Sequence, residues 1–306
     1  MRVLVTGATG FVGRSVVKAL RSDGDEVHAL VRDPATAGGL GEAVTVHAGD
    51  MRQPDSYVPL VADVDAVVHA AMLATAGRVT RAKASAIFDA DAVMTGALAQ
   101  ACLRQGKRLV YTGGCFDWGD RGDEWITERT PLAPSPMGVG HARQAAVLQR
   151  LHQEQGLDVV RINPGFVYGP GGLLRTAFVD QARRGRLRCI GNGQNWWSCV
   201  HVDDLGAAYA LAVRGAKPGA YYAVADDQPL RLRALTDAVT DAMGLKRAGQ
   251  APPWLVGLFT GGPLVASLVT SFRVDASAIR KDLGWQPAHA SFPDAAGEAV
   301  HAITAG

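Results

Sequence analysis

"VLVTGATGFVG", residues 3–13, places three glycines directly after a short apolar run and before a helical stretch. In such a strand-turn-helix, Gly7 permits the tight turn, Gly10 lets backbone N–H groups approach a pyrophosphate, and Gly13 lets the helix pack closely on the strand. A helix is expected near Phe11–Arg21, so the glycines have the context that a dinucleotide-binding fingerprint requires. The sequence therefore predicts a dinucleotide cradle in its first turn.

Apolar runs of strand length alternate with helical stretches through the first half of the chain. The expected strands are Val3–Thr6, Val27–Arg32, Val44–His47, Ala66–Ala70, Arg108–Thr112 and Val159–Ile162. The expected helices between them lie near Phe11–Arg21, Phe88–Gln105 and Gly140–Gln155. This alternation predicts an α/β fold, a Rossmann-like, doubly wound parallel sheet.

The spacing loosens after Pro164, where Gly169-Pro170-Gly171-Gly172 interrupts the pattern. Further helices are expected near Leu174–Arg184, Leu205–Val213, Leu232–Met243 and Ala276–Leu283. We therefore expect a dinucleotide-binding domain formed by residues 1–165 with about 200–225. Residues 166–199 and 226–306 are expected to form a smaller C-terminal substrate-binding lobe.

Composition points to a small-molecule partner. The chain has 306 residues, 48% of them hydrophobic, and a formal net charge of +2, which gives no strong field for nucleic acid or an anionic membrane. The four cysteines show no C-x-x-C pair or zinc spacing, and the chain opens on a strand rather than a secretory leader, so a cytoplasmic protein is expected.

Residues 251–272 carry no charged side chain, a length that raises the question of a membrane span. Gly261-Gly262-Pro263 divides this run into two pieces, each too short to cross a bilayer. The pieces are expected to form a pocket wall or lid, and no integral membrane segment is expected.

The adenosine end of a dinucleotide is predicted at the tips of the second and third strands. Arg32 follows the second strand and matches a ribose 2′-phosphate, whereas the acidic Asp33 just beyond it matches a free 2′-hydroxyl. NADP(H) is therefore favoured over NAD(H). After the third strand, Asp50 could bond the adenine amino group and Met51 could cover the ring.

Seven short motifs are spread over nearly the whole chain. They are "TGATGFVG" (6–13), "GDM" (49–51), "VVHAA" (67–71), "LVYTGG" (109–114), "RINPGFVYGPGG" (161–172), "VHVDDL" (200–205) and "DLGWQP" (282–287). Together they resemble the extended short-chain dehydrogenase/reductase family, which includes nucleotide-sugar epimerases and dehydratases. The resemblance implies an NAD(P)-dependent enzyme and, by analogy, a homodimer formed through the helices near 88–105 and 140–155. The cofactor-binding residues expected from the motifs and the resemblance are Gly7, Thr9, Gly10, Phe11, Val12, Gly13, Arg32, Asp50, Met51, Ala70, Ala71, Thr112, His141, Pro164, Gly165, Phe166 and Val167.

The catalytic positions of this family are altered. Its Tyr-x-x-x-Lys pair registers on Met137 and His141, and a thioether cannot carry a proton. The family's serine registers on Gly113 or Gly114, which leaves Thr112 as the nearest hydroxyl. In the resembling enzymes the phenol transfers the proton, the ammonium lowers the pKa of the phenol and holds the ribose, and the hydroxyl orients the carbonyl.

Three explanations of this change stay open. The protein could be a reductase or dehydrogenase in which His141, Asp117, Tyr168 or Glu128 supplies the proton. It could catalyse an isomerisation, elimination or cyclisation with His141 as general acid and base. It could instead be a sensor that binds NADP(H) without catalysis.

Single residues also keep more than one interpretation. His141 could hold a cofactor ribose, transfer a proton or face solvent, and Tyr168 could anchor its loop by packing. The "HVDDL" motif resembles a metal site, but Asp203 or Asp204 is better explained as a helix N-cap, and no metal is expected.

The substrate is expected to be a small, fairly apolar carbonyl or alcohol compound. The residues expected in its pocket are Met72, Gly114, Phe116, Trp118, Met137 and Trp197.

Overall fold

Seven parallel strands form the central sheet of the protein. A computed structural model describes residues 1–73 and 77–305. The sheet order is β12-β7-β5-β4-β1-β2-β3. The strands are β1 (Arg2–Thr6), β2 (Glu26–Val31), β3 (Val44–Ala48), β4 (Ala66–His69), β5 (Arg108–Thr112), β7 (Val159–Pro164) and β12 (Tyr221–Val224). The predicted Rossmann-like parallel sheet is thus confirmed.

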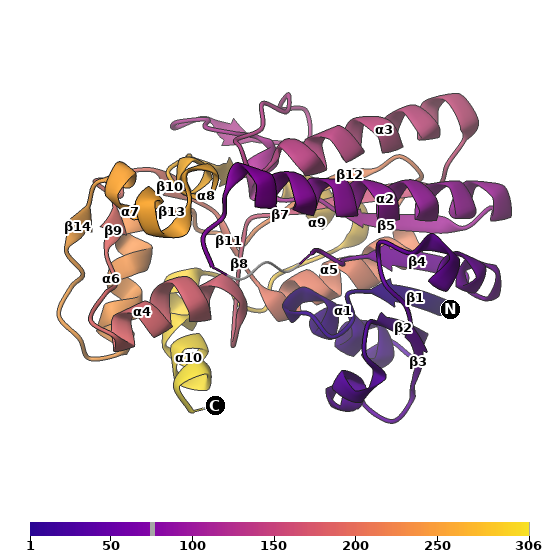
Figure 1. Ribbon diagram of the computed structural model, residues 1–306, viewed down its shortest axis with the longest axis horizontal. Helices are drawn as coiled ribbons and strands as arrows, with labels where there is room; N and C mark the ends of the chain where they lie inside the picture. Colours follow the sequence, from indigo (N-terminus) through magenta and orange to yellow (C-terminus); the bar gives the residue numbers. More distant parts are fainter. Residues whose placement is uncertain (74–76, 306) are drawn as a thin grey trace.

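Helices cover both faces of this sheet (Figure 1). Helices α1 (Phe11–Ser22) and α5 (Val202–Gly215) lie on one face, and α2 (Arg81–Gln105) and α3 (Val139–Gln155) lie on the other. Val3 and Val5 of β1 belong to the core on the α1 and α5 side, whereas Leu4 belongs to the core on the α2 and α3 side. Both faces of the strand are therefore apolar, as a sheet buried on two sides requires.

Several elements differ from the sequence prediction, and the helix Phe292–Ala305 was not among those expected. Helix α2 begins at Arg81 rather than near Phe88, because the hydroxyl of Thr80 accepts the N–H of Lys83 and caps the helix earlier. Strand β12 was not predicted. It is a short run after Gly219, and pairing with β7 rather than its own pattern makes it a strand.

The second lobe lies to the left in Figure 1 and has its own apolar core. Its elements are the π-helical turn Leu174–Val179, α4 (Asp180–Arg183), β9 (Cys189–Ile190), β10 (Trp196–Trp197), β13 (Leu230–Arg231), α6 (Leu232–Ala242), β14 (Gln250–Ala251), α7 (Pro253–Thr260), α8 (Gly262–Leu268) and α10 (Phe292–Ala305). Three further pieces join the lobes: β6 (Trp125–Ile126) pairs with β15 (Arg273–Val274), β8 (Phe166–Tyr168) pairs with β11 (Cys199–His201), and α9 is Ser277–Leu283.

The uncharged run 251–272 forms two short helices, as its central glycines predict. Gly261 separates α7 from α8 with a φ of 105°, and a Cβ there would lie 1.9 Å from the carbonyl oxygen of Val79. Only glycine fits at this junction. Among the described residues, α2 alone is long and apolar enough to cross a bilayer, but about half of it is buried against the rest of the protein, as in many core helices.

The contact between α1 and the turn after β1 gives a first prediction. A Cβ at Gly13 would lie 2.0 Å from the carbonyl oxygen of Gly7, so Gly13→Ala should destabilise the fold by about 1–3 kcal/mol through overpacking. Gly96 in α2 has no atom within 4 Å of such a Cβ, so Gly96→Ala should stabilise by about 0.5–1 kcal/mol. Urea denaturation measures both, and equal effects of the two substitutions would contradict the packing argument.

Candidate active site

Close backbone contacts form the glycine cradle. Gly7 has a φ of 66°, and a Cβ there would lie 2.7 Å from the Cα of Ala71 and 2.9 Å from the carbonyl oxygen of Ala70. Helix α1 starts at Phe11 with no side-chain cap, so its first N–H groups are left for a ligand. These features fit a dinucleotide pyrophosphate, because helix N–H groups without a capping side chain favour an anion and the glycines let backbone groups approach it.

The remaining cradle residues hold the turn in place. The guanidinium of Arg14 donates to the carbonyl of Thr9 at 3.1 Å. The ring of Phe11 lies against the Gly171-Gly172 backbone, where a Cβ at Gly172 would approach it to 2.6 Å. Val12 packs partly buried against the core below.

The sheet order places the cradle at a topological switch point. Strands β1 and β4 are neighbours, with β2 and β3 on one side and β5 and β7 on the other. In open parallel sheets the ligand cleft lies at the carboxyl ends of the strands where the order reverses. Gly7, Ala70, Gly113 and Gly165 all follow such strand ends.

At the adenosine end, the two charged residues after β2 differ in their bonding. Asp33 caps the 3-10 turn Pro34–Gly39, and its carboxylate accepts the N–H of Ala35 at 3.0 Å. Arg32 is exposed, and its guanidinium has no hydrogen bond or ion pair among the described residues, although its charge contributes to the lowered pKa of Asp50. The Arg32 guanidinium can therefore still form hydrogen bonds with a ligand at this strand tip.

Asp50 and Met51 follow β3. Hydrogen bonds from Arg52 hold the Asp50 carboxylate and lower its pKa to about 2. The side chain of Met51 is buried in the core with Leu30 and Tyr57. The prediction that this side chain covers an adenine ring is therefore wrong, because core packing already occupies it.

At the nicotinamide end, several predicted contacts are used within the protein. The N–H of Gly165 donates to Val224 at 2.9 Å and that of Phe166 to Ser198 at 2.8 Å. The Thr112 hydroxyl donates to the carbonyl of His69 at 2.8 Å and accepts from Tyr209 at 2.7 Å. The hydroxyl proton of Thr112 is therefore used in a hydrogen bond within the protein, and the prediction of Thr112 as a catalytic hydroxyl is corrected.

A histidine and a carboxylate face each other at the first turn of α3, beside the residues predicted to occupy the positions of the family's tyrosine and lysine. His141 lies in the first turn of α3, and Met137 lies two residues before that helix. The Nδ1 of His141 is 3.6 Å from Oδ1 of Asp117, whose side chain is 1% exposed. The other oxygen of Asp117 accepts the Gly114 N–H at 3.1 Å and the Asn163 amide at 2.8 Å. Oδ1 has no hydrogen bond among the described residues, and His141 is its ion-pair partner.

This pairing changes the acidity of His141. Burial lowers the pKa of the imidazole, but the carboxylates of Asp117 and then Asp91 outweigh burial, so the pKa is raised above its ordinary value. His141 keeps a 24% exposed side chain. The residue is therefore a partly accessible imidazole that holds its proton at higher pH than a free histidine.

The glycines after β5 have different surroundings. A Cβ at Gly113 would lie 2.1 Å from Oδ1 of Asn163, whereas a Cβ at Gly114 would lie 3.4 Å from Nδ1 of His141. Gly114, not Gly113, is therefore the position that faces His141. Asn163 was missed as a site residue, although the quoted motif "RINPG" contains it.

A second buried polar network lies behind the cradle and was also missed. Oγ1 of Thr6 is 2.8 Å from Nδ1 of His69 and accepts the N–H of Ala71 at 3.2 Å. Nε2 of His69 is 3.5 Å from the carboxylate of Asp91, which accepts the Tyr111 hydroxyl at 2.9 Å. Burial raises the pKa of Asp91, but His69 outweighs this effect, and the net direction is down. The signal in the sequence was a charged residue on an otherwise apolar face of α2.

Three other predicted site residues are in the core. Tyr168 is 0% exposed, with its hydroxyl 3.5 Å from the carbonyl of Ser291, so the prediction of a catalytic Tyr168 is wrong. Trp118 and Trp197 are 0% and 1% exposed, so they are core residues rather than the predicted pocket walls. Both indole rings pack within the apolar core of the second lobe.

The remaining predicted site residues differ in how far they are exposed and in what they contact. Met72 is exposed, while Phe116 and Met137 are half-buried. Phe116 packs edge-on against Phe272. Glu128 accepts the N–H of Ala223 at 3.0 Å and so anchors the loop to β12.

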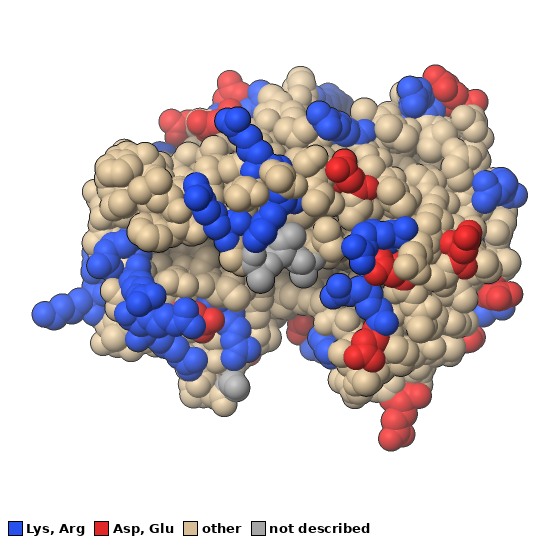
Figure 2. All heavy atoms as spheres, viewed as in Figure 1, with Lys and Arg blue, Asp and Glu red and all other residues tan. Residues whose placement is uncertain are grey.

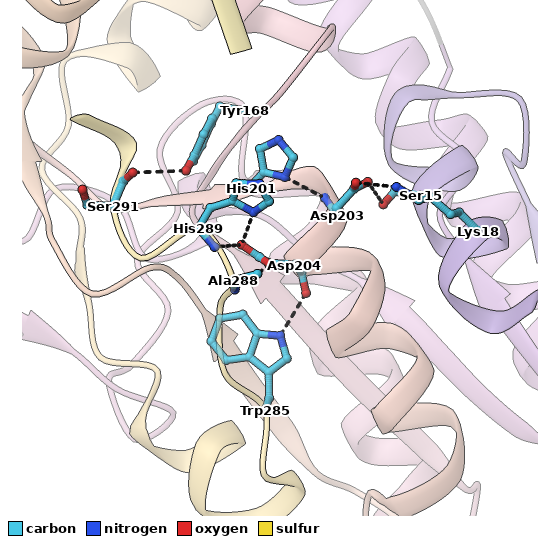
Figure 3. A network of polar contacts seen from close by, with 10 residues as sticks. All are labelled: Ser15, Lys18, Tyr168, His201, Asp203, Asp204, Trp285, Ala288, His289 and Ser291. Carbon is cyan, nitrogen blue, oxygen red and sulfur yellow. Dashed lines mark hydrogen bonds and ion pairs between the residues drawn. The ribbon is translucent and has the colours of Figure 1, made fainter. Parts of the chain in front are cut away.

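Three side chains lie close enough together to be considered as metal ligands, those of His201, Asp204 and His289 (Figure 3). Their possible ligand atoms all lie within 4.8 Å of one another. The carboxylate of Asp204 already accepts the N–H groups of Ala288 and His289 and the ring Nδ1 of His289. The two imidazoles stack with centroids 3.7 Å apart, so their in-plane lone pairs do not converge on one point. The group instead fastens the start of α5 to residues 285–291.

The same group corrects the predicted helix cap. The N-cap of α5 is His201, whose Nδ1 accepts the N–H of Asp203 at 3.3 Å. Asp203 binds Ser15 and Lys18 of α1, as Figure 3 shows. The two aspartates therefore join α5 to neighbouring elements rather than cap it.

The sheet order and the glycine cradle define an NAD(P)-binding fold. The chain belongs to the NAD dependent epimerase/dehydratase family, whose model matches residues 3–225. It is 32% identical to a 3-diazoavenalumate denitrifying reductase of Streptomyces sp, over 97% of this chain and 99% of the relative. It is 28% identical to a 2-alkyl-3-oxoalkanoate reductase of Stenotrophomonas maltophilia, over 82% and 78%. The dTDP-glucose 4,6-dehydratase DesIV of Streptomyces venezuelae, solved with NAD and TYD, superposes with a TM-score of 0.85 at 25% identity, covering 100% and 97%.

The pair of His141 and Asp117 gives a second prediction. Asp117→Asn removes the carboxylate that raises the pKa of His141, so NMR titration of the imidazole should give a lower pKa than in the unchanged protein. A raised folded-state pKa stabilises the protein fully below the unfolded pKa of about 6.5, and this stabilisation is lost as pH rises through the folded pKa. Asp117→Asn should therefore also weaken the pH dependence of the free energy of unfolding. Asp89→Asn, on the exposed face of α2, is the control. An unchanged His141 titration in Asp117→Asn would refute the pairing.

Proposed function

We propose that the protein is an NADP(H)-dependent reductase of a small, apolar carbonyl compound, with His141 as the proton donor and Asp117 as its positioning partner. The observation that carries this proposal is the approach of 3.6 Å between Nδ1 of His141 and Oδ1 of Asp117, beside the residues on which we register the family's Tyr-x-x-x-Lys. The two relatives named above are both reductases. Both are named for acting on carboxylates with an apolar body, and we propose the same substrate class here.

Carbonyl reduction by this mechanism needs few protein groups besides His141 and Asp117. NADPH, when bound, supplies the hydride that adds to the carbonyl carbon. The developing alkoxide needs one proton, which the imidazolium of His141 can give to the oxygen. Asp117 then balances the charge change at His141, and solvent returns the proton through the exposed part of the ring. The product is an alcohol.

The proposal of NADP(H) is supported by the difference between Arg32 and Asp33. A guanidinium without a partner can bind a 2′-phosphate, whereas the carboxylate of Asp33 already caps a turn.

Arg32→Glu should therefore weaken NADPH binding by about tenfold or more and leave NADH binding nearly unchanged or improved. Titration calorimetry with both cofactors measures this. Arg129→Glu makes the same charge change in the exposed loop after β6 and should alter neither affinity. An equal loss for both cofactors in Arg32→Glu would argue against a 2′-phosphate contact.

A second candidate reaction is reductive removal of nitrogen from a diazo compound. It is favoured by the name of the 32% identical relative and by Met137 at the position of the phenol. In this reaction hydride adds to the carbon of an arenediazonium group, the carbon–nitrogen bond breaks with its electrons and N₂ leaves. No oxygen has to be protonated, so the loss of a phenol would carry no penalty.

His141→Ala distinguishes these reactions. Carbonyl reduction should lose about 100-fold or more in kcat with NADPH affinity unchanged, which is the typical contribution of a general acid. Reduction of an ortho-diazo phenol, followed by NADPH oxidation and N₂ release, should change little. Weakened NADPH binding with unchanged kcat would instead assign His141 to holding the ribose, and the proton-donor role would be wrong.

A further inference from the structure

A groove of about 530 Å³ lies between the amino-terminal parts of α2 and α3 and the helix α8. A volume of this size is typical of pockets for small organic ligands. Its apolar lining residues include Phe88, Val139, Pro136, Pro263 and Ala266. Ser85 is the one hydroxyl among the lining residues, so the groove offers little to a sugar.

Two guanidinium groups also line this groove, those of Arg81 in α2 and Arg143 in α3. Both residues are exposed, and neither has a hydrogen bond or ion pair within the described part of the chain. None of the described residues that line the groove is acidic. Figure 2 shows basic side chains over the beginning of α2, beside the tan surface of α8. The groove therefore combines an apolar wall with uncompensated positive charge.

Hydrogen bonds fix the third wall of the groove beside the candidate active site. The hydroxyl of Ser267 in α8 accepts the N–H of Met137 at 3.0 Å and pairs with the hydroxyl of Ser135 at 2.9 Å. His141 lies between Val139 and Arg143 in the first turns of α3. The groove thus borders the same helical segment that carries the proposed proton donor.

We propose that this groove binds an apolar carboxylic acid, with Arg81 and Arg143 as specificity-determining residues for its carboxylate. The identification of this acid as the substrate rests on the proposed function. A guanidinium matches a carboxylate with two parallel N–H bonds, and an apolar wall removes an aryl or alkyl body from water. The first turns of α2 and α3 also favour negative charge through their dipoles.

Two probes with one apolar body test the charge preference. 4-Phenylbutanoate and 4-phenylbutan-1-ol are titrated by calorimetry into the full-length protein. The acid should bind about tenfold or more tightly than the alcohol, and Arg81→Gln with Arg143→Gln should remove most of that difference. Arg150→Gln, exposed on α3 outside the groove, should keep it. Equal affinities in the unchanged protein, or a preference that survives in the double variant, would overturn the proposal.

A filling variant tests the location. Ala266 is exposed on α8, so Ala266→Trp should fill the groove and weaken both probes about tenfold without changing NADPH affinity. Ser85→Trp fills the same space from α2 and replaces it if Ala266→Trp does not fold. Unchanged probe binding in a folded filling variant would refute the groove as the site. A change of sedimentation from dimer to monomer in the double arginine variant, with the acid preference intact, would assign the groove to a second copy.

The experiments distinguish a failure of the proposed reductase function from a failure of the proposed groove. If the unchanged protein does not bind NADPH, the proposed function is wrong, whereas the comparison of acid with alcohol still decides the groove.

Discussion

The close approach of α1 to the turn after β1 is the constraint on which the nucleotide site depends. A Cβ at Gly13 or Gly7 would collide with backbone atoms of the Gly7 turn or of Ala71, so these three segments touch without side chains between them. Backbone contact at this distance fixes where α1 begins and aims its free N–H groups at the carboxyl ends of β1 and β4. The rest of the cleft is arranged around that point, because β2, β3, β5 and β7 all end at the same edge.

Many buried polar groups near this edge are hydrogen-bonded within the protein, and Oδ1 of Asp117 is one of the exceptions among the described residues. Thr6, His69, Asp91 and Tyr111 exchange hydrogen bonds or lie within ion-pair distance of one another. Asp117 receives two N–H groups on one oxygen and none on the other. A buried carboxylate oxygen without a partner is costly unless a cation stands beside it. Here His141 takes that place.

The fold could be predicted from the sequence to a much greater extent than the site. Apolar runs and the glycine spacing report local geometry, and they gave six of the seven sheet strands nearly to their ends, while β12 depends on pairing with β7. The glycine motif predicted the close backbone contacts at Gly7 and Gly13, whereas the roles of these residues and of His141 in binding or catalysis stay predictions. Tyr168, Trp118 and Trp197 were misplaced because an aromatic residue in a loop motif looks the same whether it lines a pocket or fills the core of the second lobe. Asn163 and Asp91 were missed because their roles depend on contacts across strands, which no spacing along the chain reveals.

The proposed exchange of a lysine for His141 would change more than the shape of the site. A lysine ammonium is charged at all physiological pH values and would neutralise Asp117 permanently, whereas an imidazole neutralises it only while protonated. Asp117 and Asp91 raise the pKa of His141 and so extend the pH range in which the buried carboxylate is compensated. The same raised pKa keeps a transferable proton at the partly exposed ring. One group, His141, therefore balances the charge of the buried carboxylate and, in the proposed reaction, also supplies the proton at the cleft.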